Sequence, residues 1–343
     1  MKLSAPVLTS LSGRGIIADD HPFSAGGLGT HSTPMSQRIL NEADVLLNLG
    51  CRFESMETNW TPDFSPALGA CHIQVNLDAS EIGRSFPADI AVVADIRTFL
   101  TDLLIELDRS GRRPDSPQQR IAELARGVAA LDSDAERMAA SNRTPIHPIR
   151  VLRAARAVFP RESTTAIDIG CLAEQLGGAF PWFRVFEPRS VIAPSSLYGM
   201  GDGAAGLPVA RLVYPDRPAV GFVGDGSFQM IMDVLPVAAE YQLGVTWCIL
   251  NDMALGSIRD IQVGRLNGRF IATDFAVQPD FAKLAEACGC YGERVETPGD
   301  VEAALKRALA ANQAGRPAVL DFLVMRARSP QTAKFFHIKD AEF

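Results

Sequence analysis

The stretch AVGFVGDGSF at residues 219–228 and the stretch VTWCILNDMALG at residues 245–256 decide the fold. Each opens with an apolar run of strand length and closes on small and acidic residues. The 24 residues between Gly226 and Asn251 leave room for one helix and one strand, the content of a crossover between parallel strands. Parallel strands bring their carboxyl ends to one sheet edge, where ligands of open α/β sheets bind. We therefore expect the two loops to meet at that edge.

Oxygen donors stand where each of these two strands ends. Asp225 and Asp252 supply carboxylates, and the backbone carbonyl group of Ala254 supplies a third oxygen. Mg²⁺ prefers oxygen ligands and keeps phosphate oxygens in its coordination shell. The pattern therefore predicts a site for Mg²⁺ and a diphosphate.

Small residues next to the carboxylates fit the same ligand. Gly224 and Gly226 let the backbone approach a ligand closely. The amides of Gly226 and Ser227 open the next helix, where an anion is favoured. A Gly-Asp-Gly triplet alone is more often only a turn, and the second copy at residues 201–203 has no Asn-Asp partner at the required distance. We interpret that copy as unrelated to the metal.

Composition excludes several other classes of protein. The 343 residues carry a net charge of -7, which disfavours binding to nucleic acid or to an anionic membrane. The chain has no apolar run of about 18 residues and no signal-peptide pattern at its start, so no membrane span is expected. None of the six cysteines forms a Cys-x-x-Cys pair, which argues against zinc and iron–sulfur sites and favours a reducing, cytoplasmic location.

Apolar runs alternate with helical patterns in two parts of the chain, which predicts the α/β class with two doubly wound parallel-sheet domains. We expect a Rossmann-like central domain at residues 1–107, a linker with a helix at 108–147, and a ligand-binding domain with a C-terminal tail at 148–343. The strands are expected at residues 7–9, 45–50, 72–78, 90–93, 165–169, 219–223, 245–250 and 318–324. The helices are expected at residues 36–43, 96–107, 118–138, 151–159, 281–288 and 301–312.

The paired motif resembles the metal signature of thiamine-diphosphate (ThDP) dependent enzymes of the acetolactate synthase and 2-oxo acid decarboxylase superfamily. That signature is Gly-Asp-Gly, about two dozen residues, and Asn-Asn. Asp252 stands at the second Asn, keeps an oxygen ligand and is expected to tighten Mg²⁺ binding by its added charge. The resemblance implies ThDP and Mg²⁺ as cofactors, with Asp225, Asp252 and Ala254 as the metal ligands, and it covers nearly the whole chain.

The same resemblance implies which residues contact ThDP. Met200 matches the bulky residue that holds the cofactor in a bent form, and the backbone of Tyr198 and Met200 would bond its aminopyrimidine. A core methionine is the alternative interpretation of Met200. Besides Gly224, Gly226 and Ser227, the cofactor-binding residues implied are Tyr198, Gly199, Met200, Gly170, Cys171, Leu255 and Gly256.

Residues 1–107 resemble the central domain of the superfamily, which binds FAD in some members. The Gly-Gly-Leu-Gly run at residues 26–29 offers close approach but does not complete a dinucleotide fingerprint. We interpret it as a structural turn, with FAD as the alternative. Residues 2–7 resemble the approach to the second strand of this domain, so its first strand and helix are expected to be missing.

No part of the chain resembles the pyrimidine-binding domain that carries the catalytic glutamate of the superfamily. We therefore assign no catalytic residue to this chain and expect that glutamate in a partner. The implied protein is one subunit of a hetero-oligomer, a heterotetramer, that decarboxylates a 2-oxo acid such as pyruvate and transfers or releases the product. The alternatives are a truncated fragment and a non-catalytic binding or regulatory subunit.

Two other segments carry open alternatives. Ile258, Arg259 and Gln262 follow the metal loop on a helix that could face the substrate. The alternative is a helix face that is solvated or packs within the protein. Residues 335–338 either fold over the site, cover the partner or form a packed terminus. A Rossmann dehydrogenase would need a dinucleotide fingerprint, and a ferredoxin-dependent oxidoreductase would need cluster cysteines, and the sequence shows neither.

Overall fold

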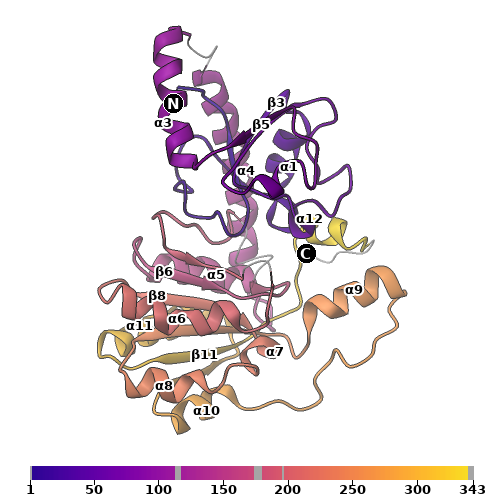
Figure 1. The fold of residues 1–343 in the computed structure, drawn as a ribbon. Helices are drawn as coiled ribbons and strands as arrows, with labels where there is room; N and C mark the ends of the chain where they lie inside the picture. Colours follow the sequence, from indigo (N-terminus) through magenta and orange to yellow (C-terminus); the bar gives the residue numbers. More distant parts are fainter. Residues whose placement is uncertain (1, 113–116, 174–179, 195–196, 339–343) are drawn as a thin grey trace.

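The computed structural model describes residues 2–112, 117–173, 180–194 and 197–338. An N-terminal region (residues 2–112) and a C-terminal region (residues 148–338) each combine strands with helices, and a long helix joins them (Figure 1). Residues 113–116, between the first region and this helix, lie outside the described residues. None of the described helices is both long and apolar enough to cross a membrane.

The C-terminal region is built on one parallel sheet with the strand order β10-β11-β9-β8-β6-β7. Strands β8 and β9 are neighbours near its centre, and Gly224 pairs with Leu250, so the ends of both strands reach the same edge. The crossover predicted from the 24-residue spacing is confirmed. The strands are β6 (Thr164–Ile167), β7 (Val191–Ile192), β8 (Ala219–Gly224), β9 (Val245–Asn251), β10 (Tyr291–Val295) and β11 (Ala318–Leu323).

Helices cover both faces of this sheet. Phe222 and Leu250 lie in an apolar cluster with α5 and α11, whereas Val223 and Trp247 lie in a second cluster with α6, α8 and α10. Because successive side chains of a strand point to opposite faces, burial of both faces requires the continuous apolar runs seen in the sequence. The doubly wound architecture is confirmed here. The helices are α5 (Pro148–Val158), α6 (Asp202–Val213), α7 (Asp225–Phe228), α8 (Val234–Glu240), α9 (Gly256–Leu266), α10 (Phe281–Ala287) and α11 (Val301–Gln313), with the 3-10 turn η4 (Pro298–Asp300).

The N-terminal region is also parallel, but its strands form two separate sheets, β1-β2 and β3-β4-β5. The sequence predicted one alternating α/β sheet, and among the described strands no hydrogen-bonded neighbour joins β1 to β3. The elements are β1 (Val7–Thr9), β2 (Ser24–Gly27), η1 (Gly29–His31), α1 (Pro34–Asn41), β3 (Val45–Leu49), α2 (Ser55–Thr58), β4 (Cys71–Asn76), η2 (Ala79–Glu81), β5 (Ile90–Val93) and α3 (Ile96–Ser110).

Strand β2 corrects one expectation from the sequence. Its four residues, Ser-Ala-Gly-Gly, are all buried and run parallel to β1, where a turn was expected. Small side chains allow β2 to lie against the helices α1 and α4 (Pro117–Ala139). The strand contains none of the β-branched or aromatic residues that identify a strand in a sequence. The turn interpretation therefore fails for Gly26 and Gly27.

The connector is a packed helix, α4 (Pro117–Ala139). Leu124 on α4 contacts a cluster formed by Phe23, Met35 and Phe180, which come from both regions. Farther along, Ala135 joins the core around α5. The linker helix expected at residues 118–138 is confirmed, and its contacts join the two regions.

The chain returns to the N-terminal region at its end, through α12 (Pro330–Phe335) (Figure 1). Phe335, Phe336 and Ile338 pack against Phe64, with α9 residues at the edge of the same cluster. Ser329 caps α12 by accepting a hydrogen bond from the amide of Thr332 at 3.0 Å. Of the three interpretations of residues 335–338, the packed terminus matches this arrangement.

Candidate cofactor and metal site

Asp225 is the first residue after β8 and begins the one-turn helix α7. Its side chain is almost fully enclosed, because the residue is 1% exposed. The Gln278 amide nitrogen donates a hydrogen bond to Asp225 Oδ2 at 2.9 Å. Burial, and next the negative charge of Asp252, raise the pKa of the Asp225 carboxyl to about 7. A cation bound between the two carboxylates would offset the cost of burying two negative charges close together.

Asp252 follows β9, and its side chain is 4% exposed. Arg326 donates from Nε to Asp252 Oδ2 at 3.0 Å and from Nη2 to the Asp252 carbonyl oxygen at 3.2 Å. Burial raises the pKa of Asp252, while the Arg326 charge opposes that rise. The sequence analysis missed Arg326, whose positive charge opposes the extra negative charge that was expected to tighten Mg²⁺ binding.

Ala254 lies in the loop between β9 and α9 and is 4% exposed. It forms an antiparallel bridge with Asp274. The hydrogen bonds of this bridge run from the Leu255 amide to Thr273 and from the Phe275 amide to Met253, at 2.8 and 2.9 Å. The Ala254 carbonyl is thus left out of the bridge, which suits the third oxygen ligand expected from the sequence.

Two glycines lie in close contact with side chains of neighbouring loops at this edge. A Cβ atom on Gly226 would lie 2.6 Å from Leu255 Cδ2, and one on Gly256 would lie 2.6 Å from Cys171 Sγ. The Gly256 position is also 3.4 Å from Asp252 Oδ2. A side chain at Gly226 or Gly256 would have to displace Leu255 or Cys171. Leu255 and Gly256 therefore pack against the segments that follow β8 and β6, at the carboxyl edge of the sheet.

The helix expected after Gly226 is much shorter than the sequence suggested. Helix α7 ends at Phe228, and a separate helix, α8, begins at Val234. One turn offers only a few N-terminal backbone amides, of which that of Gly226 donates to the Asp225 carboxylate, and it builds little of the dipole that a longer helix has. Attraction of an anion here therefore depends on the amides and the metal.

The segment after β6 reaches the same edge. Gly170 has a positive φ of 133°, and space remains open around its Cβ position. The Cys171 thiol is buried among apolar residues, and burial followed by the Asp252 charge raises its pKa. Cys171 therefore packs against the loop that follows β9, so that a diphosphate bound here would contact the backbone of this segment and not the thiol.

Asp168 is a buried carboxylate that the sequence analysis missed. It accepts hydrogen bonds from the amides of Gly201 at 3.0 Å, Ala204 at 2.9 Å and Ile169 at 2.8 Å. Burial raises the pKa of Asp168, and these hydrogen bonds lower it. Asp168 thereby attaches the start of α6, which contains the second Gly-Asp-Gly copy, to the end of β6.

Tyr198, Gly199 and Met200 lie directly before this attached helix start. Tyr198 has a positive φ of 47°, and Met200 is 36% exposed, so Met200 is not the core methionine of the alternative interpretation. A Cβ atom on Gly201 would lie 2.4 Å from Ile231 Cγ2, just beyond α7. The fold therefore places this segment beside the loop that follows Asp225.

The helix after the metal loop is occupied by internal contacts. Gln262 is buried and exchanges two hydrogen bonds with the backbone of Ile271, at 3.1 and 3.0 Å. Arg259 pairs with Asp274 at 3.1 Å and lies 3.9 Å from the Phe270 ring centroid. Of the three residues suggested to face substrate, only Ile258 is exposed. The packing interpretation holds for Arg259 and Gln262.

Two family models match this chain. The C-terminal TPP binding domain of thiamine pyrophosphate enzymes matches residues 168–322, and the central domain of the same enzymes matches residues 1–103. The chain belongs to the thiamine pyrophosphate enzymes. Thiamine pyrophosphate is ThDP, so the family and the cofactor named from the paired motif are confirmed.

Relatives within the thiamine pyrophosphate enzymes carry more than one name. A probable acetolactate synthase large subunit of Methanococcus aeolicus is 29% identical over 351 residues, covering 99% of this chain and 57% of that protein. One of Methanocaldococcus jannaschii is 30% identical, covering 93% and 53%. A sulfoacetaldehyde acetyltransferase of Rhodobacter capsulatus is 26% identical, covering 94% and 57%. The chain spans about half the length of the curated relatives it matches.

The donor set of this thiamine pyrophosphate enzyme fits a hard cation. Among the described residues, no group of three or more His, Cys, Asp and Glu side chains is placed to hold a metal. Two carboxylates and a carbonyl leave coordination positions for diphosphate oxygens and water, which is how Mg²⁺ is commonly held with phosphates. All six cysteines are free thiols.

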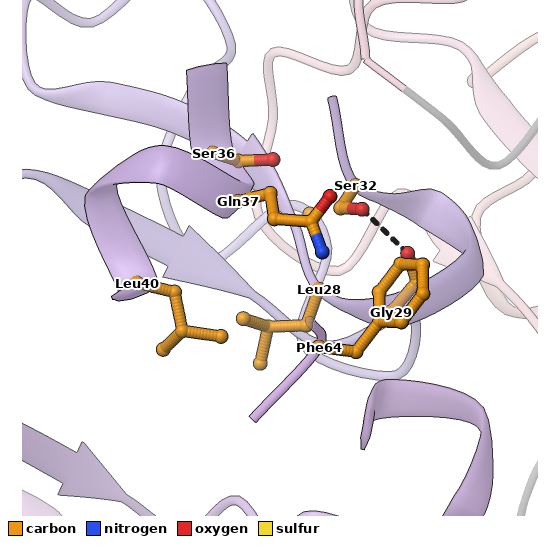
Figure 2. Close-up of a pocket in the computed structure, with 8 residues that line it drawn as sticks. Leu28, Gly29, Ser32, Ser36, Gln37, Leu40 and Phe64 are labelled. Carbon is orange, nitrogen blue, oxygen red and sulfur yellow. Dashed lines mark hydrogen bonds between the residues drawn. The ribbon is translucent and has the colours of Figure 1, made fainter. Parts of the chain in front are cut away.

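A small pocket in the N-terminal region is lined in part by the glycine run for which FAD was the alternative interpretation (Figure 2). Its lining residues are Gly27, Leu28, Gly29, Ser32, Ser36, Gln37, Leu40 and Phe64. Ser32 donates to the Gly29 carbonyl at 2.6 Å, and the Gln37 amide donates to the carbonyl of Asp63. A Cβ atom on Gly29 would lie 1.8 Å from the Met56 carbonyl oxygen. The polar groups and glycines here serve contacts within the chain, which gives FAD no support.

Proposed function

We propose that this chain is the diphosphate- and Mg²⁺-binding subunit of a ThDP-dependent 2-oxo acid decarboxylase or carboligase of the acetolactate synthase type. One observation carries the proposal. Asp225 and Asp252 are buried together at the ends of adjacent strands, close enough for the charge of one to raise the pKa of the other. Buried like charges are costly unless a cation joins them.

The residues of this chain bind and orient the cofactor. Asp225, Asp252 and the Ala254 carbonyl hold Mg²⁺, and the amides of Gly226 and Ser227 face the diphosphate. Gln278 keeps the Asp225 carboxylate oriented through its hydrogen bond. When bound, ThDP supplies the carbon nucleophile and the electron sink for decarboxylation of a 2-oxo acid. Met200, beside the attached start of α6, supports the bent form of the cofactor.

The domain boundaries belong to the proposal. Residues 1–107 are the central domain, 108–147 the linker and 148–343 the cofactor domain with its tail. The matches to residues 1–103 and 168–322 support this division. The packed helix α4 between them supports a connector with a fixed path.

The catalytic glutamate and the pyrimidine site come from a partner subunit in a heterotetramer. Exposed apolar side chains next to residues of the site support this assignment, because they suit a covered surface. These are Leu197, beside Tyr198, and Val277, beside Gln278. A reducing, cytoplasmic location accords with the six free cysteines.

The proposal is tested by copurification from native cells and by an assay with pyruvate. We expect a stoichiometric partner of about one domain in size, and pyruvate consumption only when both chains are present. Consumption by the isolated chain would refute the split arrangement. ThDP binding without consumption by the reconstituted complex would favour a non-catalytic subunit.

A further inference from the structure

Arg326 occupies a special position beside the proposed metal ligands. It donates to Asp252 Oδ2 through Nε at 3.0 Å and to Asp274 Oδ1 through Nη2 at 2.9 Å. Asp274 in turn pairs with Arg259 at 3.1 Å. The four side chains alternate in sign, so Asp252 lies at the buried end of a chain of charges that sums to zero.

The backbone fixes Arg326 next to Asp252. The Val324 amide, two residues before Arg326, donates to the Asn251 carbonyl at 2.9 Å. The Met325 amide donates to the Ile146 carbonyl, also at 2.9 Å. The Arg326 side chain is 31% exposed, against 4% for Asp252, so the guanidinium closes over the carboxylate from the solvent side.

The ion pair changes what Asp252 offers to a cation. Arg326 engages Oδ2 and leaves Oδ1 outside the pair. A carboxylate paired with a guanidinium has no net charge, like an asparagine amide, and still presents one oxygen. The two side-chain ligands, Asp225 and Asp252, and the guanidinium of Arg326 together carry one negative charge. Without Arg326, the two ligands would carry two.

We propose that Arg326 is a positioning residue for the metal, which with Asp252 forms a neutral oxygen ligand in place of an asparagine. The inference rests on the proposed function, because it assigns Arg326 a role toward the same cation. Arg326 sets the affinity for the metal by balancing charge and fixes which carboxylate oxygen faces it. The aspartate therefore does not tighten metal binding in the native protein.

A double-mutant cycle on the purified chain tests this pairing, with Mn²⁺ as the probe and free Mn²⁺ measured by electron paramagnetic resonance, with and without ThDP. Asp252→Asn leaves the Arg326 charge unbalanced and should weaken Mn²⁺ binding about tenfold or more. Arg326→Met leaves the negative charge of the Asp252 carboxylate unbalanced and should tighten Mn²⁺ binding severalfold. The double variant should return to within about threefold of the native affinity.

Controls separate charge balance from a structural ion pair. Arg326→Lys keeps the positive charge, so its affinity for Mn²⁺ should stay near the native value. If Arg326→Met does not fold, Arg326→Lys and Arg326→Gln carry the test. Arg259→Met removes the arginine that pairs with Asp274 and should change the affinity by less than about twofold. Urea unfolding of each variant reports its folding.

Two results overturn the inference and remain distinguishable. One result is that Asp252→Asn weakens Mn²⁺ binding equally in the presence and in the absence of Arg326, and that Arg326→Met does not change this binding. The arginine would then be only structural. A native chain that binds neither Mn²⁺ nor ThDP would remove the proposed function, and with it any role of the pair toward a metal.

Discussion

At the scale of single residues, Asp225 links the fold to the chemistry. Its carboxyl is buried, receives a hydrogen bond from Gln278 and lies in the field of Asp252. With its pKa near 7, the native metal-free chain holds a proton on Asp225 between about pH 4 and pH 7, where the unfolded chain has lost it. The native state binds more protons than the unfolded state in that window, so stability falls as pH rises through it.

Asp225→Asn should remove this pH dependence. In EDTA, the unfolding free energy of the variant relative to that of the native protein should increase by about 2 kcal/mol as the pH is raised from 5 to 8. Urea unfolding at both pH values measures this difference. Asp216→Asn is the matched control at an exposed aspartate and should show no such gain. A pH-independent difference for Asp225→Asn would contradict the account.

Asp168→Ala should loosen the start of α6. The substitution leaves the buried amides of Gly201 and Ala204 without their acceptor, which costs about 2–4 kcal/mol of unfolding free energy. Asp168→Asn keeps one acceptor oxygen and should cost less. Hydrogen exchange of residues 201–205 checks the location, and unchanged exchange in Asp168→Ala would refute this role.

The spacing of strand-end residues identified part of the site from the sequence. It predicted that Asp225 and Asp252 lie close together at the ends of neighbouring strands, and they do. Gln278 and Arg326 were missed, because one lies on an irregular segment and the other lies 74 residues beyond Asp252. Such contacts follow from packing and leave no local pattern. Asp168 did have a signal, since it directly follows a buried strand just as Asp225 does.

At the scale of elements, long apolar strands were predicted well and short or polar ones were not. Strands β8, β9 and β11 are apolar on both faces, so their type and length were clear. The edge strand β10 contains charged, half-buried residues and was missed. The all-small strand β2 was taken for a turn. Burial at those positions comes from neighbouring elements that a local pattern does not contain.

Gly264 joins α9 to the C-terminal segment and gives a prediction at this scale. A Cβ atom there would lie 1.9 Å from the Phe336 carbonyl oxygen, so Gly264→Ala must displace the backbone. We expect a loss of about 1–3 kcal/mol in unfolding free energy and faster proteolysis near α12. Gly299→Ala enters open space and serves as the control. Equal proteolysis of both variants would contradict the predicted contact.

At the scale of the whole molecule, apolar side chains close to the site remain exposed in the single chain. Leu197 is next to Tyr198, and Val277 is next to Gln278, and both are more than four-fifths exposed. The partner that we propose would cover them, because the proposal places the cofactor between the diphosphate site of this chain and a pyrimidine site on the partner.

Leu197→Ser and Val277→Ser should each weaken partner binding at least about tenfold, while the stability of the isolated chain changes by less than about 0.5 kcal/mol. Surface plasmon resonance with the copurified partner measures the affinity. Ile105→Ser, on the exposed face of α3, is the control and should leave it unchanged. Native affinity in both site variants would place the partner on another face.

The most direct test of the central claim is a calorimetric titration of ThDP into the protein in Mg²⁺ and in EDTA, for the native chain and for Asp225→Asn. The account predicts saturable binding in Mg²⁺, weakened at least about tenfold by EDTA and to a similar extent by the substitution. ThDP binding that neither EDTA nor Asp225→Asn alters would contradict a metal-linked diphosphate site at the ends of β8 and β9.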